Sequence, residues 1–129
     1  MKIHASGEDY LEAILILQTQ MGESAVRSVD LARYMGYSKP SISHAVGVLR
    51  NGSFLTIDEN GFLHLTDTGR KVAEKIYERH QFFTKQLMSI GVERKTAEQD
   101  ACKIEHAISE ESFSKLKKAL MEGGGDMGS

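Results

Sequence analysis

Apolar residues recur at intervals of three and four along most of the chain, a period that predicts helices. The first predicted helix covers residues 8–20 and follows Ser6 and Gly7. Its apolar side chains are Tyr10, Leu11, Ile14, Leu15 and Leu17. One face of this helix is therefore expected to lie in a core.

Two shorter helices are predicted next, with a tight turn between them. The first begins at Ser28, interpreted as its N-cap, and ends before Gly36, a residue suited to a helix C-terminus. The second begins after Ser38, carries Pro40 in its first turn and ends at Asn51-Gly52. The pair predicts a helix-turn-helix, in which the second helix enters the major groove of DNA.

Two β-rich runs follow, at residues 54–57 and 62–66. They are joined through Asp58-Glu59-Asn60-Gly61, whose Asn-Gly pair favours a hairpin turn. A hairpin directly after a helix-turn-helix is a wing. The predicted fold class is therefore mainly α with a small β-hairpin wing, a winged helix-turn-helix followed by a helical domain.

A long helix is predicted from Thr66 to Gly91. Its common stripe consists of Val72, Ile76, His80, Phe83 and Leu87. Because this length exceeds what a small module buries alone, we expect part of the helix to pack against a second copy of the chain in a homodimer.

Two more helices are predicted, over residues 96–109 and 110–121, before a glycine-rich segment. We expect three parts: a DNA-binding domain at residues 1–70, a helical dimerisation domain at 71–122 and a flexible tail at 123–129.

Composition narrows the class of protein. The 129 residues are 40% hydrophobic and 26% charged with one proline, as in soluble, mostly helical proteins. The sequence has neither a long apolar run nor a start like a secretory signal, so we expect a cytoplasmic protein without a membrane partner.

Charge is distributed unevenly along the chain. The net charge of −2 argues against a protein that binds nucleic acid indiscriminately. Residues 27–50, however, carry four basic side chains and one acidic one, a local excess of three positive charges. The predicted helix-turn-helix is thus the basic part of the chain.

The second helix of the helix-turn-helix exposes short hydrogen-bonding groups opposite its apolar face. These are Lys39, Ser41, Ser43 and His44, with Gly47 beside them. Arg27 and Arg50 flank the helix and could hold the phosphate backbone. The alternatives are a solvated surface, or a winged helix that binds protein instead of DNA.

A possible metal site lies near the C-terminal end. Cys102, Glu105 and His106 stand at i, i+3 and i+4, so their side chains gather on one side of a helix. Thiolate, carboxylate and imidazole together favour a divalent transition metal over calcium or magnesium. Taken alone, Cys102 could also be inert packing.

Asp9 and Glu12 form a second acidic pair, three residues apart on the first helix. The positive end of the helix dipole already explains acidic residues in a first turn, so the pair has two interpretations. His80 likewise could be a ligand or a satisfied core histidine.

With the winged helix and the Cys102, Glu105 and His106 trio in place, the sequence resembles the diphtheria-toxin-repressor family of metal-dependent regulators, from about residue 6 to residue 120. The most specific match, to the metal-site helix of the family's iron branch, is Asp100-Ala101-Cys102-Lys103-Ile104-Glu105-His106. Similarity to the start of the recognition helix lies in Ser38-Lys39-Pro40-Ser41-Ile42-Ser43, so Ser38 and Pro40 are also expected to contact DNA. By contrast, Gly7-Glu8-Asp9-Tyr10-Leu11-Glu12 is similar to the manganese branch.

The resemblance implies a set of metal ligands in this chain, namely Asp9, Glu12, His80, Cys102, Glu105 and His106. Glu98 falls where the iron branch has an ancillary histidine, which a carboxylate could replace, and Thr84 departs from an ancillary glutamate. The mixture of branches leaves Fe²⁺ and Mn²⁺ both open, with Zn²⁺, Co²⁺ or Ni²⁺ possible in vitro. The chain resembles the shorter, two-module members of the family.

The function implied is a homodimeric repressor, not an enzyme, that binds operator DNA when metal is plentiful and controls metal-homeostasis genes. Three rivals remain: a winged-helix regulator that responds to a small organic ligand, a metalloprotein for storage or delivery without DNA binding, and a metalloenzyme. The absence of an HExxH or nucleophile motif argues against the enzyme.

Overall fold

The structure is a computed structural model that describes the backbone of residues 5–127 and the side chains of residues 7–121. The described chain forms two compact units, which meet within one long helix, between Tyr77 and Glu78. The first unit contains α1 (Ala5–Met21), α2 (Ser28–Met35), α3 (Lys39–Asn51), β1 (Leu55–Ile57), β2 (Leu63–Leu65) and the start of α4 (Asp67–Ser89). The second contains the rest of α4, α5 (Arg94–Ala107) and α6 (Glu110–Met127).

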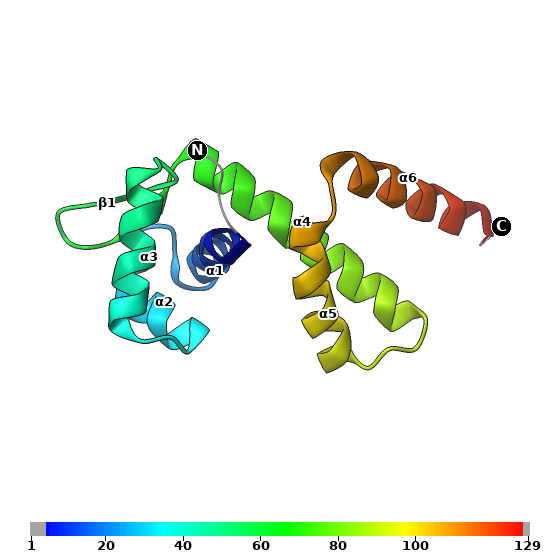
Figure 1. Cartoon of the computed structure of the whole chain (residues 1–129), viewed down its shortest axis with the longest axis horizontal. Coiled ribbons are helices and arrows are strands. Elements are labelled where there is room, and N and C mark those ends of the chain that lie inside the picture. The colour runs from blue at the N-terminus through cyan, green and yellow to red at the C-terminus, as the bar shows by residue number, and fades with distance from the viewer. Residues whose placement is uncertain (1–4, 128–129) are drawn as a thin grey trace. The chain divides into compact units, whose positions relative to one another are not determined.

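The first unit is a winged helix-turn-helix, which confirms the predicted fold class. Helices α1, α2 and α3 pack against one another, and the hairpin lies beside α3 (Figure 1). The largest fully buried side chains at the centre of this unit are Leu11, Ile14, Leu31, Ile42, Leu55, Leu63 and Val26. They come from α1, α2, α3, both strands and the loop before α2, so the recognition helix and the wing are held by one core.

The start of α2 differs from the prediction. Arg27, not Ser28, is the N-cap, with an extended backbone at φ −116° and ψ 168°. The Arg27 N–H donates to the Asp30 carboxylate at 2.9 Å, and Arg27 also forms an isolated antiparallel bridge with Phe62. The helix therefore begins one residue earlier than predicted, at Ser28. The turn after α2 is as predicted, since Gly36 adopts a left-handed conformation at φ 71°.

Helix α3 begins and ends as the sequence predicts. The Ser38 hydroxyl accepts a hydrogen bond from the Ser41 N–H at 3.3 Å, and Pro40 lies in the first turn. Asn51 is the last helical residue. Ile42, Val46 and Leu49 are buried, which turns the opposite face of the helix outward.

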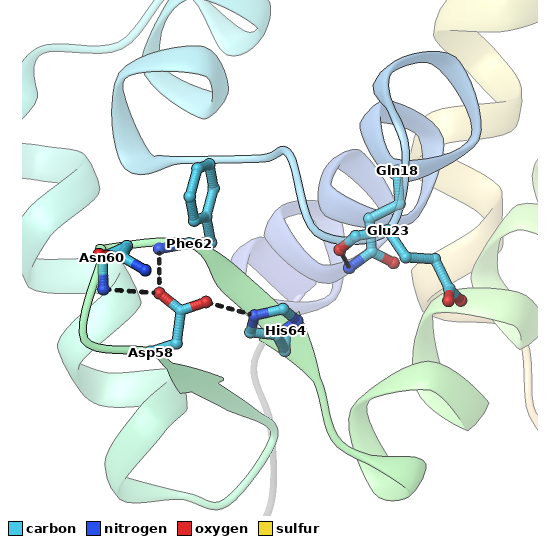
Figure 2. A network of polar contacts seen from close by, with 6 residues as sticks. All are labelled: Gln18, Glu23, Asp58, Asn60, Phe62 and His64. Atoms are coloured by element: carbon cyan, nitrogen blue, oxygen red, sulfur yellow. Dashed lines mark hydrogen bonds and ion pairs between the residues drawn. The ribbon is translucent and has the colours of Figure 1, made fainter.

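The wing is an antiparallel hairpin in which Leu55 pairs with Leu65 and Ile57 with Leu63. Its turn is built around Asp58, whose carboxylate accepts hydrogen bonds from the N–H groups of Asn60 and Phe62 and contacts the His64 ring (Figure 2). Gly61 completes the turn at φ 84°, a conformation that favours glycine. The predicted hairpin is therefore confirmed.

The first turns of α4 belong to the winged-helix core. Ala73 is fully buried there, and Val72 packs against the same core. The two compact units consequently meet after Tyr77, seven residues beyond the domain boundary expected at residue 70. Helix α4 itself covers nearly the predicted range.

The second unit has its own small core. Phe82 and Phe83 of α4 pack with Ala101 of α5 and Phe113 of α6, and the Phe82 and Phe113 rings meet edge to face at 5.5 Å between centroids. Helix α6 extends to Met127, six residues past its predicted end at Met121 and through the glycine-rich segment. It thus covers most of the segment expected to be a tail, whose residues 128–129 lie outside the described residues. No helix in residues 5–127 is both long and apolar enough to span a membrane.

Candidate functional site

Helix α5 carries three side chains that can bind a metal ion on one side. Ala97, Ala101 and Glu105 follow one another at intervals of four and are all buried, so Glu105 occupies a position on the face that packs into the unit. Cys102 and His106 lie beside this face. One ligand atom from each of Cys102, Glu105 and His106 lies within 4.8 Å of the others. The structure therefore brings together the trio expected from its spacing.

The Glu105 carboxylate lies between two imidazole rings. His80 of α4 places Nδ1 at 3.0 Å from Oε2, and His106 places Nε2 at 3.4 Å from Oε1. The Glu105 side chain is fully buried. Burial of a carboxylate is costly unless positive charge or hydrogen bonds compensate it, and here one imidazole nitrogen lies near each of the two carboxylate oxygens.

This donor set fits a divalent transition metal. Cys102, Glu105 and His106 offer a thiol that becomes a thiolate when it loses its proton, a carboxylate and an imidazole, and Glu105 also meets the His80 imidazole. Cys102 is exposed, which leaves the site a route to solvent. Within the second unit, the residues that could hold the ion are His80, Cys102, Glu105 and His106.

Asp9 and Glu12 lie on α1, in the first unit. Each carboxylate acts on a nearby tyrosine of that unit. The pKa of Tyr10 is raised by burial first, and then by Tyr37 and Asp9. The pKa of Tyr34 is raised by burial, Glu12 and Tyr77, in that order. Their role as metal ligands stays a prediction.

Glu98 lies on the exposed side of α5. Its carboxylate pairs with Arg94 at 3.3 Å, as an i, i+4 ion pair on the helix surface. Glu98 does not belong to the donor clusters found among the described residues. Its part as an ancillary ligand likewise stays a prediction.

The predicted DNA-reading residues form one exposed surface at α3 and its margins. Lys39, Ser43, His44 and Arg50 are exposed, and so are Ser38, Pro40 and Ser41. Ser38 has an additional structural task, since its hydroxyl caps α3 and donates to the Ser41 hydroxyl at 2.9 Å. The Arg27 guanidinium stacks on the Phe62 ring at 4.3 Å, which ties this flanking residue to the wing.

Arg79, next to the candidate metal site, was not predicted as a functional residue. Arg79 precedes His80 on α4 and is buried, and its guanidinium donates to backbone carbonyls at the end of α5. The only available signal was its position, next to a histidine on an otherwise apolar stripe.

Fold and site together define a class: a winged helix-turn-helix protein whose helical second unit holds a transition-metal donor set. The comparisons agree with this class. Residues 66–123 match the family described as iron dependent repressor, metal binding and dimerisation domain.

Relatives match across most of the chain. The transcriptional regulator MntR of Salmonella typhimurium is 33% identical over 106 residues, which is 82% of this chain and 66% of that protein. The regulator MntR of Geobacillus kaustophilus is 32% identical over 104 residues, 81% of this chain and 72% of that protein. The solved structure of the manganese regulator SloR superposes with a TM-score of 0.78 at 25% identity, over 88% of this chain and 53% of that one.

The chain therefore belongs to the family of metal-dependent transcriptional regulators that includes MntR and the diphtheria-toxin repressor, as its resemblance implied. It spans just under two thirds of the Salmonella protein and about half of the SloR chain.

Proposed function

We propose that this protein is a metal-dependent transcriptional repressor that binds operator DNA as a homodimer and controls metal-ion homeostasis. One observation carries the proposal: a fully buried Glu105 carboxylate lies between His80 and His106 in a chain whose other unit is a winged helix-turn-helix. A buried cluster of acid and imidazoles needs a cation to make it favourable, and the winged helix supplies a DNA-reading surface.

The proposed ion is Mn²⁺ or Fe²⁺. SloR is described as a manganese regulator, and another solved relative at 25% identity is described as a manganese-dependent repressor in complex with manganese. Cys102 is a softer donor than the remaining oxygen and nitrogen ligands and favours iron, so both metals remain in the proposal. When bound, the metal supplies positive charge that neutralises the carboxylates.

His80, Cys102, Glu105 and His106 would hold the ion in the second unit. We propose Asp9 and Glu12 as further ligands, on their residue types and on the resemblance to the manganese branch. Glu98 is proposed as an ancillary ligand because it falls where the iron branch has an ancillary histidine, and it would first have to exchange its ion pair with Arg94.

On the DNA side, the short exposed groups of α3 would read base edges, with Lys39 and Arg50 at the phosphates. Two copies of α3 in a dimer would then contact two half-sites about one helical turn of DNA apart. Metal that favours this spacing strengthens operator binding, and neutralised carboxylates repel the phosphates less. A regulator of this kind works in the cytoplasm, beside the genome.

The test is fluorescence anisotropy of DNA from upstream of the gene, titrated with metal-free protein at fixed salt. Addition of Mn²⁺, or of Fe²⁺ without oxygen, is expected to tighten binding at least about tenfold. Glu105→Gln should abolish this gain. Lys39→Ala should weaken binding with and without metal and lower the salt dependence by about one ion. Lys115→Ala, at an exposed residue of α6, is the matched control for loss of a positive charge.

Equal affinity with and without metal would contradict the proposal and favour a regulator that responds to an organic ligand. Metal binding without any DNA binding would favour a metal-storage or delivery protein instead.

A further inference from the structure

The end of α5 is held by a single buried guanidinium from α4. Arg79 Nη1 donates to the carbonyl oxygen of Glu105 at 3.1 Å and to that of Ile108 at 2.7 Å. The Arg79 side chain is only 7% exposed, and its guanidinium stacks on the Phe113 ring at 5.1 Å. Nη2 reaches the Glu110 carboxylate, in the first turn of α6, at 3.1 Å.

The Glu105 carbonyl, in the last turn of α5, needs a donor from outside the helix. The last carbonyls of a helix have no N–H partner within the helix, and α5 ends at Ala107. A positive charge at this end also complements the helix dipole. Arg79 thus does for the C-terminus of α5 what a capping residue does elsewhere, from a neighbouring helix.

Glu105 is fixed at both ends by consecutive residues of α4. Arg79 holds its backbone carbonyl, while the His80 ring meets its carboxylate at 3.0 Å. His106 follows Glu105 directly, within the same final turn of α5. Any rotation or fraying of this turn would move two donor side chains away from His80 together.

From this arrangement we infer that Arg79 is a positioning residue for the metal centre, which rests on the proposed function. Its hydrogen bonds go to two backbone carbonyls and to the Glu110 carboxylate. It sets the distance between α4 and the last turn of α5, and through Glu110 it joins that turn to the start of α6. The metal affinity of the chain therefore depends on a residue that is not a ligand.

The test uses the full chain and Co²⁺, whose absorption bands report the number and geometry of its ligands. Arg79→Met keeps the length and apolar bulk of the side chain and removes its donors. It is expected to weaken Co²⁺ binding about 10–100-fold, the usual effect of losing a group that orients a ligand, and to shift the absorption bands. Arg79→Lys keeps the positive charge but not the planar guanidinium with its several N–H donors. It should weaken Co²⁺ binding less than Arg79→Met does.

The matched control is Lys117→Met. Lys117 of α6 pairs with Glu78 of α4. This variant therefore removes an ion pair between α4 and α6, the helices that Arg79 and Glu110 also join, and leaves the contacts at the end of α5 in place. Its Co²⁺ affinity and spectrum are expected to equal those of the wild type. Thermal unfolding of the metal-free proteins separates loss of stability from loss of the site.

An Arg79→Met protein that is less stable but binds Co²⁺ with wild-type affinity and spectrum would overturn the inference and leave the proposed function standing. If Arg79→Met does not fold, the neutral Arg79→Gln replaces it, and wild-type affinity and spectrum there would overturn the inference equally. Wild-type protein that binds no Co²⁺ would contradict the proposed function itself, and the inference with it.

Discussion

Glu105 occupies a position on α5 that the pattern of the helix assigns to a small apolar side chain. Ala97 and Ala101 precede it on the same buried face, and Ala101 packs against the phenylalanines of the second unit. A carboxylate at such a place lowers stability unless something compensates its charge. That cost is understandable if the residue binds a cation, because binding energy then offsets it.

Gly69 shows a close approach between the first turn of α4 and the wing. A Cβ atom at this position would lie 1.9 Å from the Phe54 carbonyl oxygen, which is backbone and cannot easily move. We expect Gly69→Ala to lower the free energy of unfolding by about 1–3 kcal/mol, measured by urea unfolding. Gly47→Ala is the control, since a Cβ there meets nothing within 4 Å and alanine favours the helix by about 0.5–1 kcal/mol. Equal effects of the two substitutions would show that the contact with Phe54 is not tight.

Asp58 gives a prediction about pH. Its hydrogen bond with His64 lowers the pKa of the Asp58 carboxyl, and the Phe62 and Asn60 N–H groups act in the same direction. Because this pKa is lower in the folded than in the unfolded protein, the stabilisation is present above about pH 4 and is lost as the pH falls through the folded value. Carbon-detected NMR titration should find the Asp58 pKa below its ordinary value. In His64→Gln the pKa of Asp58 should rise part of the way back to its ordinary value. An unchanged pKa in this variant would mean that the backbone N–H groups alone lower it.

Ser38 combines two tasks in one short segment, as N-cap of α3 and as a predicted DNA contact. Ser38→Ala is expected to cost about 1 kcal/mol of folding free energy, because the Ser41 N–H loses its acceptor. Ser43→Ala is the control, at an exposed position inside the same helix where alanine is the better helix former. Chemical unfolding distinguishes them, and an unchanged stability in Ser38→Ala would argue that the hydroxyl serves only DNA.

Helices and the hairpin were predictable because their signals are local. The cap at Ser38, the glycine at Gly36 and the Asn-Gly turn each act within a few residues, and the structure has α3, the turn and the wing where these residues place them. The start of α2 could not be predicted in the same way. It depends on the bridge between Arg27 and Phe62, which lie far apart in the sequence.

The candidate site was predictable only in part, for the same reason. Cys102, Glu105 and His106 stand within one turn of a helix, so their spacing is enough to bring them together. From the sequence pattern alone, His80 could be a core residue or a metal ligand. Only the resemblance to the family favoured the ligand. Arg79 acts through backbone carbonyls of a distant helix, which no pattern of side chains records.

The division of the chain into two compact units follows from where α4 buries its faces. Its first turns pack with the winged helix and its later turns with α5 and α6, so one continuous helix belongs to both cores. Family membership indicates the same pairing of a DNA-reading unit with a metal-binding one. We propose that metal binding in one unit and DNA binding in the other are energetically coupled.

Coupling of this kind is reciprocal: a metal that tightens DNA binding must itself be bound more tightly in the presence of that DNA, by the same factor. The most direct measurement is therefore the Mn²⁺ affinity of the protein, from the electron paramagnetic resonance of free Mn²⁺, with and without saturating upstream DNA at fixed salt. We predict an affinity at least about tenfold higher with DNA, and no such gain with a scrambled duplex. The same Mn²⁺ affinity in all three samples would contradict the account.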